Sequence, residues 1–151
     1  MTTSCEATCL ADLSQASPKI PVIGVFTTSD PRIDEDSRSR CKNIVKMAAN
    51  ILSGTIVMPD KSPVPVVYST TLIDGEAQAD MVAQQFREAG VSILVCVPDT
   101  WAFPQLSLIS LVQQFPSDTP LNITCGNSGP RPGVVFAHAV NGALSQYGRM
   151  A

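Results

Sequence analysis

The 151-residue sequence predicts a three-layer α/β sandwich, a doubly wound parallel sheet of the flavodoxin or Rossmann-like type with strand order 2-1-3-4. Three observations predict this fold. Four short apolar runs alternate with four longer amphipathic stretches, which is the pattern of strand–helix–strand units. The third apolar run is almost continuous, as in a strand covered on both faces of a parallel sheet. Hydrophobic residues make up 44% of the chain, enough for one sizeable core.

The first strand is predicted over residues 19–28, KIPVIGVFTT, which are rich in β-branched side chains. Prolines stand at its start, since they cannot lie in the middle of a sheet. A polar loop leads from it to a helix over residues 37–54. Asp36 or Ser37 is the predicted N-cap, and Gly54 is the predicted stop. The apolar side chains at helical spacing are Cys41, Ile44, Val45, Ala48, Ile51 and Leu52.

The second strand is predicted over residues 64–70, VPVVYST, after a loop that contains prolines. It is followed by a helix over residues 74–90. Acidic residues fill the first turn of this helix and Gly90 ends it, as the helix dipole and C-cap preferences favour. Its predicted apolar face consists of Ala77, Met81, Val82, Phe86 and Ala89.

The third strand is predicted over residues 91–97, VSILVCV, and a helix over residues 104–115 opens with Pro104 at a tolerated first-turn position. The fourth strand is predicted over residues 120–125, PLNITC. The last helix is predicted over residues 132–148. Its inward side chains are expected to be Val134, Val135, Ala139, Val140 and Leu144.

Composition separates residues 1–17, expected to be a flexible N-terminal tail, from residues 18–151, expected to be a single α/β domain. The net charge of -3 comes without a basic cluster, so no nucleic-acid partner is expected. No apolar run is long enough to span a bilayer and no signal peptide is recognisable, which predicts a cytoplasmic protein without membrane association. Cys5 and Cys9 lack the further ligands that a zinc site requires.

Several kinds of chemistry have no basis in this sequence. It contains neither the GxxxxGK[ST] motif for triphosphates nor the GxGxxG motif for dinucleotides. With one histidine and no paired carboxylates near it, neither an acid–base pair nor a metal site can be assembled. We therefore assign no catalytic residue, metal ligand or cofactor to this domain.

In a parallel sheet the loops that follow the strands share one edge, and ligands bind where the strand order reverses, here between the first and third strands. Asp30 and Arg32 follow the first strand, and Trp101 follows the third. Asn127 and Arg131 follow the fourth, before a helix N-terminus that favours an anion or a sugar hydroxyl. These five residues are the predicted substrate-binding set. For Arg32, a surface ion pair with neighbouring acids is an equally open interpretation.

Three segments carry a resemblance to a known family: PVIGVFTTSDPR, VSILVCVPDTW and ITCGNSGPRPGVVFAHAVNGALSQYG. They resemble the N-terminal domain of the L-fucose isomerase family, which includes L-arabinose-isomerase-like enzymes. The resemblance extends from about residue 18 to the C-terminus, with the RPG turn and the tryptophan loop as its most specific parts. The loop around Trp101 departs from the family pattern at Asp99, Thr100 and Ala102.

The resemblance implies that Trp101 extends into the active site of an adjacent subunit and packs against the sugar, and that Arg32 borders the same site. It also implies that Mn²⁺ is held by Glu, Asp and His of later domains, where ketol isomerisation proceeds through an enediol. The full-length enzyme is then expected to be a homo-oligomer, a trimer or a hexamer.

These expectations predict the N-terminal substrate-recognition and oligomerisation domain of an aldose–ketose isomerase of the L-fucose or L-arabinose type. On its own the domain is expected to be inactive, because the metal ligands lie elsewhere. Two alternatives stay open. One is a stand-alone, non-catalytic sugar-binding or regulatory module, and the other is a small flavodoxin-like binder of phosphate or nucleotide, for which the loop chemistry is poor.

Overall fold

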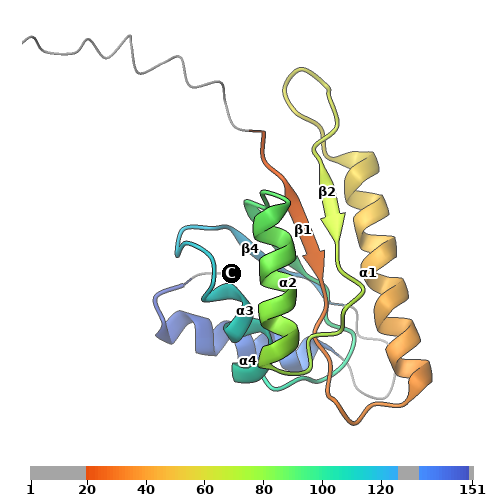
Figure 1. Ribbon diagram of the computed structural model, residues 1–151, viewed down its shortest axis with the longest axis vertical. Coiled ribbons are helices and arrows are strands. Elements are labelled where there is room, and N and C mark those ends of the chain that lie inside the picture. Colours follow the sequence, from red (N-terminus) through yellow and green to blue (C-terminus); the bar gives the residue numbers. More distant parts are fainter. Residues whose placement is uncertain (1–19, 126–132, 150–151) are drawn as a thin grey trace, which may run out of the picture.

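The computed structural model describes residues 20–125 and 133–149, and within them four parallel strands form one sheet in the order β2-β1-β3-β4 (Figure 1). The predicted fold class and strand order are confirmed. Each strand is shorter than its predicted run. A proline stands directly before β2 and before β4, where it accepts a hydrogen bond from the neighbouring strand but has no N–H to donate. The strands are β1 (Ile23–Phe26), β2 (Val66–Tyr68), β3 (Ile93–Cys96) and β4 (Leu121–Ile123).

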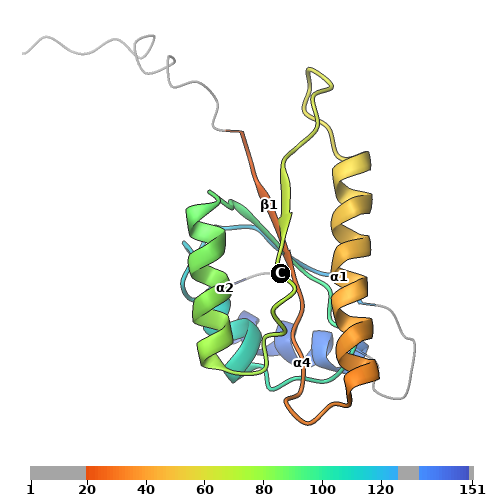
Figure 2. The same ribbon diagram turned by 45° about the vertical axis from the view of Figure 1, so that its right-hand side comes forward.

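Helices lie on both faces of the sheet, which gives three layers (Figures 1 and 2). On one face lies α1 (Glu35–Thr55), which packs on Ile23 and Val25 of β1 through Val45 and Ala49. The helical elements that pack into the core of the opposite face are α2 (Glu76–Glu88), η2 (Gln105–Ile109), α3 (Ser110–Val112) and α4 (Gly133–Gln146). None of the helices in the described ranges is long and apolar enough to cross a bilayer.

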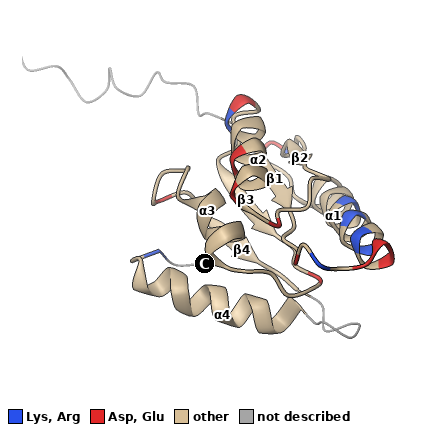
Figure 3. Ribbon diagram, turned by 60° about the horizontal axis from the view of Figure 1, so that its bottom comes forward, with Lys and Arg blue, Asp and Glu red and all other residues tan. Residues whose placement is uncertain are grey.

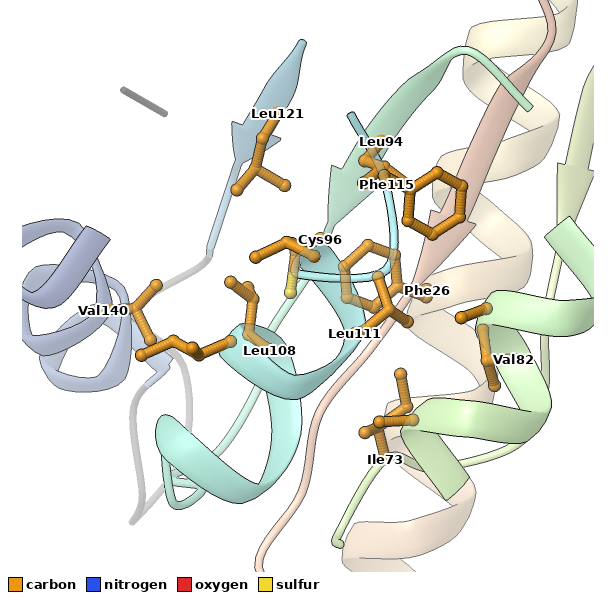
Figure 4. Packing of buried hydrophobic residues seen from close by; sticks show 14 of the residues in the cluster. Phe26, Ile73, Val82, Leu94, Cys96, Leu108, Leu111, Phe115, Leu121 and Val140 are labelled. Carbon is orange, nitrogen blue, oxygen red and sulfur yellow. The ribbon is translucent and has the colours of Figure 1, made fainter. Parts of the chain in front are cut away.

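The larger core lies between the sheet and the α2, α3 and α4 side, and its side chains interdigitate from several elements (Figure 4). Phe26 of β1 meets Phe86 of α2 edge to face, with ring centroids 6.2 Å apart. Gly24 makes this approach possible, because a Cβ at that position would lie 2.8 Å from the Phe86 ring and from Val91. The lack of a side chain at Gly24 therefore allows α2 to pack closely on the sheet.

The start and the end of α1 differ from the prediction. Asp34 is the N-cap, and its carboxylate accepts a 2.8 Å hydrogen bond from the backbone N–H of Ser37, so the choice of Asp36 or Ser37 was wrong. The earlier cap places two acidic residues in the first turn, where the helix dipole favours them. Gly54 does not stop the helix, because its backbone stays helical and the cap falls at Ile56.

The predicted apolar faces of the helices are partly wrong. Ile51, Met81 and Val135 are more than half exposed. On α2 the buried stripe uses the small residues Ala79 and Ala83 beside Val82 and Phe86, since α2 lies close to Gly24. Three predicted inward alanines, Ala77, Ala89 and Ala139, are also exposed. On α4 the buried residues are Gly133, Phe136, Val140 and Leu144, and Phe136 replaces Val135 at the core.

The helix predicted over residues 104–115 is instead a π-turn, η2, followed by the single turn of α3. The N–H of Ile109 bonds to the carbonyl of Pro104, five residues back, at 3.0 Å. Ser107 donates its hydroxyl to the carbonyl of Phe103 at 2.6 Å, and the same carbonyl also accepts the backbone N–H groups of Leu106 and Ser107. Such π-turns often lie at functional sites.

The face of the sheet beside α1 is only half covered, so the prediction that β3 is buried on both faces is wrong for Ile93 and Val95. Leu94 and Cys96 point to the larger core and are buried, whereas Ile93 and Val95 are half-buried. Beside them is a hollow of about 590 Å³, the α1-side groove. The groove is lined mainly by apolar residues of α1 and the sheet, among them Ile51, Leu52, Ile93, Val95 and Val97.

Candidate functional site

The loops that follow β1 and β3, residues 27–34 and 97–104, lie side by side at the carboxyl edge of the sheet. Thr27 donates its hydroxyl to the carbonyl of Val97 at 2.9 Å, and the N–H of Val97 bonds to the carbonyl of Phe26 at 2.9 Å. These bonds continue the β1–β3 pairing past the ends of both strands. The two loops therefore flank the position at which the strand order reverses, as the fold class requires.

Asp30 holds Arg32 in a fixed orientation. The carboxylate of Asp30 is almost fully buried, and it accepts bonds from Nε of Arg32 at 2.8 Å and from Nη2 at 2.6 Å. The backbone N–H of Arg32 donates to the same carboxylate at 2.9 Å. The hydrogen bonds and the charge of Asp30 raise the pKa of Arg32 above its ordinary value. Arg32 is thus both a member of an ion pair and a cation whose side chain remains largely exposed.

The β3 loop carries two aromatic side chains, one of which lies beside that cation. Trp101 is half-buried and meets Phe136 of α4 edge to face, with ring centroids 6.3 Å apart. Phe103 is exposed on one side, and the guanidinium of Arg32 lies 5.5 Å from its ring centroid. The structure therefore brings the loop of Asp30 and Arg32 next to the loop of Trp101. Phe103 contacts Arg32 across the two loops and was not among the predicted site residues. Its position two residues after Trp101 could have indicated a second aromatic side chain at the site.

A second ion pair lies beneath this loop. Asp99 is buried, and its carboxylate accepts a hydrogen bond from Nε of Arg40 on α1. The hydrogen bond to Asp99 raises the pKa of Arg40. Burial, followed by the charge of Asp99, raises the pKa of the neighbouring Cys41 thiol to about 11. Sequence reasoning missed this pair, because its partners are 59 residues apart in the chain and no local pattern joins them.

The start of α4 lies against the same loop. A Cβ on Gly133 would overlap the carbonyl of Pro98, so only glycine permits this approach. The predicted binding residues Asn127 and Arg131 lie outside the described residues, as do Cys5 and Cys9. Their predicted roles remain predictions.

Two hydroxyl groups near these loops are buried and lack a hydrogen-bond partner among the described residues: those of Ser29 and Thr100. A buried hydroxyl without a partner is unfavourable, and such groups occur in native proteins where water, a ligand or another chain completes the bonding. The polar edge formed by the two loops therefore has hydrogen-bonding capacity that the described residues do not use.

The charges of the described chain concentrate on α1 and on the loop that precedes it, whereas α4 carries no Lys, Arg, Asp or Glu (Figure 3). Within the described ranges, no three His, Cys, Asp or Glu residues gather in a way that could hold a metal ion. Asp30 and Asp99 are each engaged by an arginine instead. The described residues thus do not fit a Mn²⁺ site.

Comparisons with known proteins identify the family of this chain. A family model described as L-fucose isomerase, first N-terminal domain, matches residues 20–151. Similar proteins include the L-fucose isomerases of Streptococcus pneumoniae strains Hungary19A-6, CGSP14 and JJA, each 28% identical over 131 residues. The alignment covers 85% of this chain and 21% of each relative, so the chain spans about a fifth of the length of the relatives it matches. The family match covers every described strand and helix, and the chain therefore belongs to the family of L-fucose isomerase first N-terminal domains.

Proposed function

We propose that this chain acts as the first domain of an aldose–ketose isomerase of the L-fucose or L-arabinose type, where it helps to bind the sugar. The observation that carries the proposal is the exposed guanidinium of Arg32, which Asp30 fixes beside the Trp101 loop at the edge where parallel sheets bind ligands. A fixed cation next to an aromatic face suits a sugar, whose oxygens accept hydrogen bonds and whose C–H surfaces pack on rings.

In this proposal each residue has a defined task. Arg32 donates hydrogen bonds to sugar oxygens, and the half-buried indole of Trp101 packs against the C–H surface of the ring or open chain. The unpartnered hydroxyls of Ser29 and Thr100 support the idea that further polar groups complete this edge. The domain thereby orients the substrate, which lowers the entropic part of the barrier to reaction.

The proton transfer between C1 and C2 of the sugar is assigned to groups outside the described residues, which contain no candidate metal cluster. A divalent cation such as Mn²⁺, bound by those other groups, would polarise the sugar oxygens.

We also propose that the longer enzyme is a cytoplasmic homo-oligomer, a trimer or a hexamer, in which the edge formed by the two loops faces an adjacent subunit. An interface through α4 is supported by the lack of Lys, Arg, Asp and Glu on this helix and by the exposed Val135 and Tyr147.

A chimeric enzyme tests the proposal. Residues 20–151 replace the matching first domain of the L-fucose isomerase from Streptococcus pneumoniae, and ketose formation from L-fucose and L-arabinose is measured with Mn²⁺. Arg32→Ala and Trp101→Ala are each expected to lower kcat/KM by about tenfold or more, because each removes a bond or a packing surface for the sugar. Arg87→Ala, which alters a hydrogen-bonded arginine on α2 away from both loops, is the control and should leave the rate unchanged.

The outcome that contradicts the proposal is an assembled, active chimera in which both site variants keep the parent rate. If residues 20–151 instead bind L-fucose tightly with no other domain present, the stand-alone sugar-binding module becomes the better description.

A further inference from the structure

The carboxylate of Asp99 stands two positions before Trp101 and is nearly inaccessible to water, with 2% of its side chain exposed. Its hydrogen bond within the described chain comes from Arg40, whose side chain is 37% exposed. A carboxylate buried without a cation is strongly unfavourable, so the loop can keep this conformation only while Arg40 compensates the charge. Arg40 in turn can be hydrated if the pair breaks, so the electrostatic penalty falls mainly on the loop.

The helix that supplies Arg40 also begins directly after the loop that holds Arg32. Asp34 caps that helix, and Ile33 and Cys41 are buried together with Leu72, which packs the start of α1 against the segment that follows β2. Arg40 lies on the second turn of α1. The ion pair therefore connects the β3 loop to the same rigid element that carries the β1 loop.

The β3 loop has other contacts, of which one, between Phe103 and the guanidinium of Arg32, also involves a charged group. Thr27 bonds to the carbonyl of Val97, Gly133 lets α4 lie against Pro98, and Trp101 packs on Phe136. These contacts hold the loop from the side of β1 and from the side of α4. The Arg40–Asp99 pair is the one ionic contact recorded between this loop and α1 within the described residues.

We propose that Arg40 and Asp99 are positioning residues, whose ion pair holds the β3 loop against α1 so that Trp101 and Arg32 face the same ligand. The identity of that ligand rests on the proposed function, whereas the positioning of Trp101 does not. Neither residue needs to touch the sugar.

Trp101 is the only tryptophan in the sequence, so its fluorescence reports on this loop alone. In Arg40→Ala the emission of Trp101 is expected to shift to longer wavelength, and its acrylamide quenching constant to rise roughly twofold as the loop opens locally. Far-UV circular dichroism should be unchanged. Arg40→Lys, which keeps the charge, should restore values close to the parent. The double variant Arg40→Ala/Asp99→Asn should lie nearer to the parent than Arg40→Ala does, because it removes the uncompensated carboxylate.

Arg87→Ala is the matched control, since it breaks a hydrogen bond of another helical arginine, to Gln114, and should leave Trp101 fluorescence unchanged. If Arg40→Ala does not fold, Arg40→Gln takes its place, because glutamine retains a donor without the charge and should increase quenching in the same way. Fluorescence identical to the parent in the folded Arg40 variant, or a double variant no nearer to the parent than Arg40→Ala, overturns the proposal. Because this readout needs no sugar, an active chimera whose rate is unchanged by both Arg32→Ala and Trp101→Ala would reject the proposed function and leave the positioning result intact.

Discussion

The guanidinium of Arg32 lies over the ring of Phe103, 5.5 Å from its centroid, and also donates two hydrogen bonds to the carboxylate of Asp30. One arginine is therefore oriented by a buried carboxylate and by an aromatic face from a different loop. Since Phe103 follows Trp101 by two residues, this contact couples the two halves of the candidate site.

Replacement of Phe103 by alanine should weaken sugar binding without direct loss of a ligand contact. The cation–π contact is gone in this variant, and Arg32 is held by Asp30 alone. In the chimeric isomerase we expect the KM for L-fucose to rise roughly two- to fivefold, in line with an exposed cation–π contact. Phe103→Tyr keeps the ring and should match the parent. Leu106→Ala, at another exposed apolar residue nearby, is the control, and an equal effect in it would argue against the aromatic contact.

Gly24→Ala should destabilise the fold, because its Cβ would meet the Phe86 ring and Val91 at 2.8 Å. Overpacking of this kind costs about 1–3 kcal/mol. Urea unfolding followed by circular dichroism measures the change. Gly54→Ala offers a comparison of opposite sign, since nothing lies within 4 Å of its Cβ and the residue is inside α1. It should stabilise by about 0.5–1 kcal/mol, and destabilisation there would show that α1 ends earlier than the structure indicates.

Asp34→Ala should lower the free energy of unfolding by about 1 kcal/mol, because it removes the N-cap of α1. Asp36→Ala, in the first turn, loses only a favourable interaction with the helix dipole and should cost less, about 0.3–1 kcal/mol at low ionic strength. Denaturant titrations of both variants at low and high salt separate the two effects. If Asp36→Ala proves the more damaging substitution, the cap assignment is wrong.

The buried thiol of Cys41 should make stability fall at alkaline pH. Burial raises its pKa from 9.0 to about 11, so the folded state disfavours the thiolate that the unfolded chain forms readily. The stability linked to this thiol is complete below pH 9.0 and is lost as the pH rises toward about 11. Unfolding free energies of the parent and of Cys41→Ala, compared under reducing conditions across this range, should converge as the pH rises. A constant difference between the two proteins would contradict the assignment.

The elements that sequence reasoning predicted correctly depend on local pattern. The alternation of apolar runs with amphipathic stretches predicts four strands in the order that the structure shows, because right-handed crossovers allow few arrangements. Gly90 ends α2 with a positive φ, as its position after the last apolar residue suggested. The neighbouring Asp30 and Arg32 were also placed at the sheet edge from their position after β1.

The features that were missed depend on contacts between distant segments. The phase of α4 could be read with either Val135 or Phe136 inward, and the choice is made by the partners of Phe136, among them Trp101. The exposure of Ile93 follows from how far α1 covers the sheet, which no property of β3 encodes. The pairing of Arg40 with Asp99 likewise requires the assembled fold. Periodicity states which residues share a face and leaves open what lies opposite that face.

The α1-side groove has a consequence for how the isolated domain behaves in solution. Ile93 and Val95 are half-buried in this groove and remain in contact with water, so an apolar dye such as ANS should bind there and fluoresce when mixed with the folded chain. Val95→Lys should reduce that signal and raise the concentration at which the protein precipitates, whereas Val135→Lys on the far side should leave dye binding unchanged. The half-covered face of the sheet is thus expected to limit the solubility of the isolated domain.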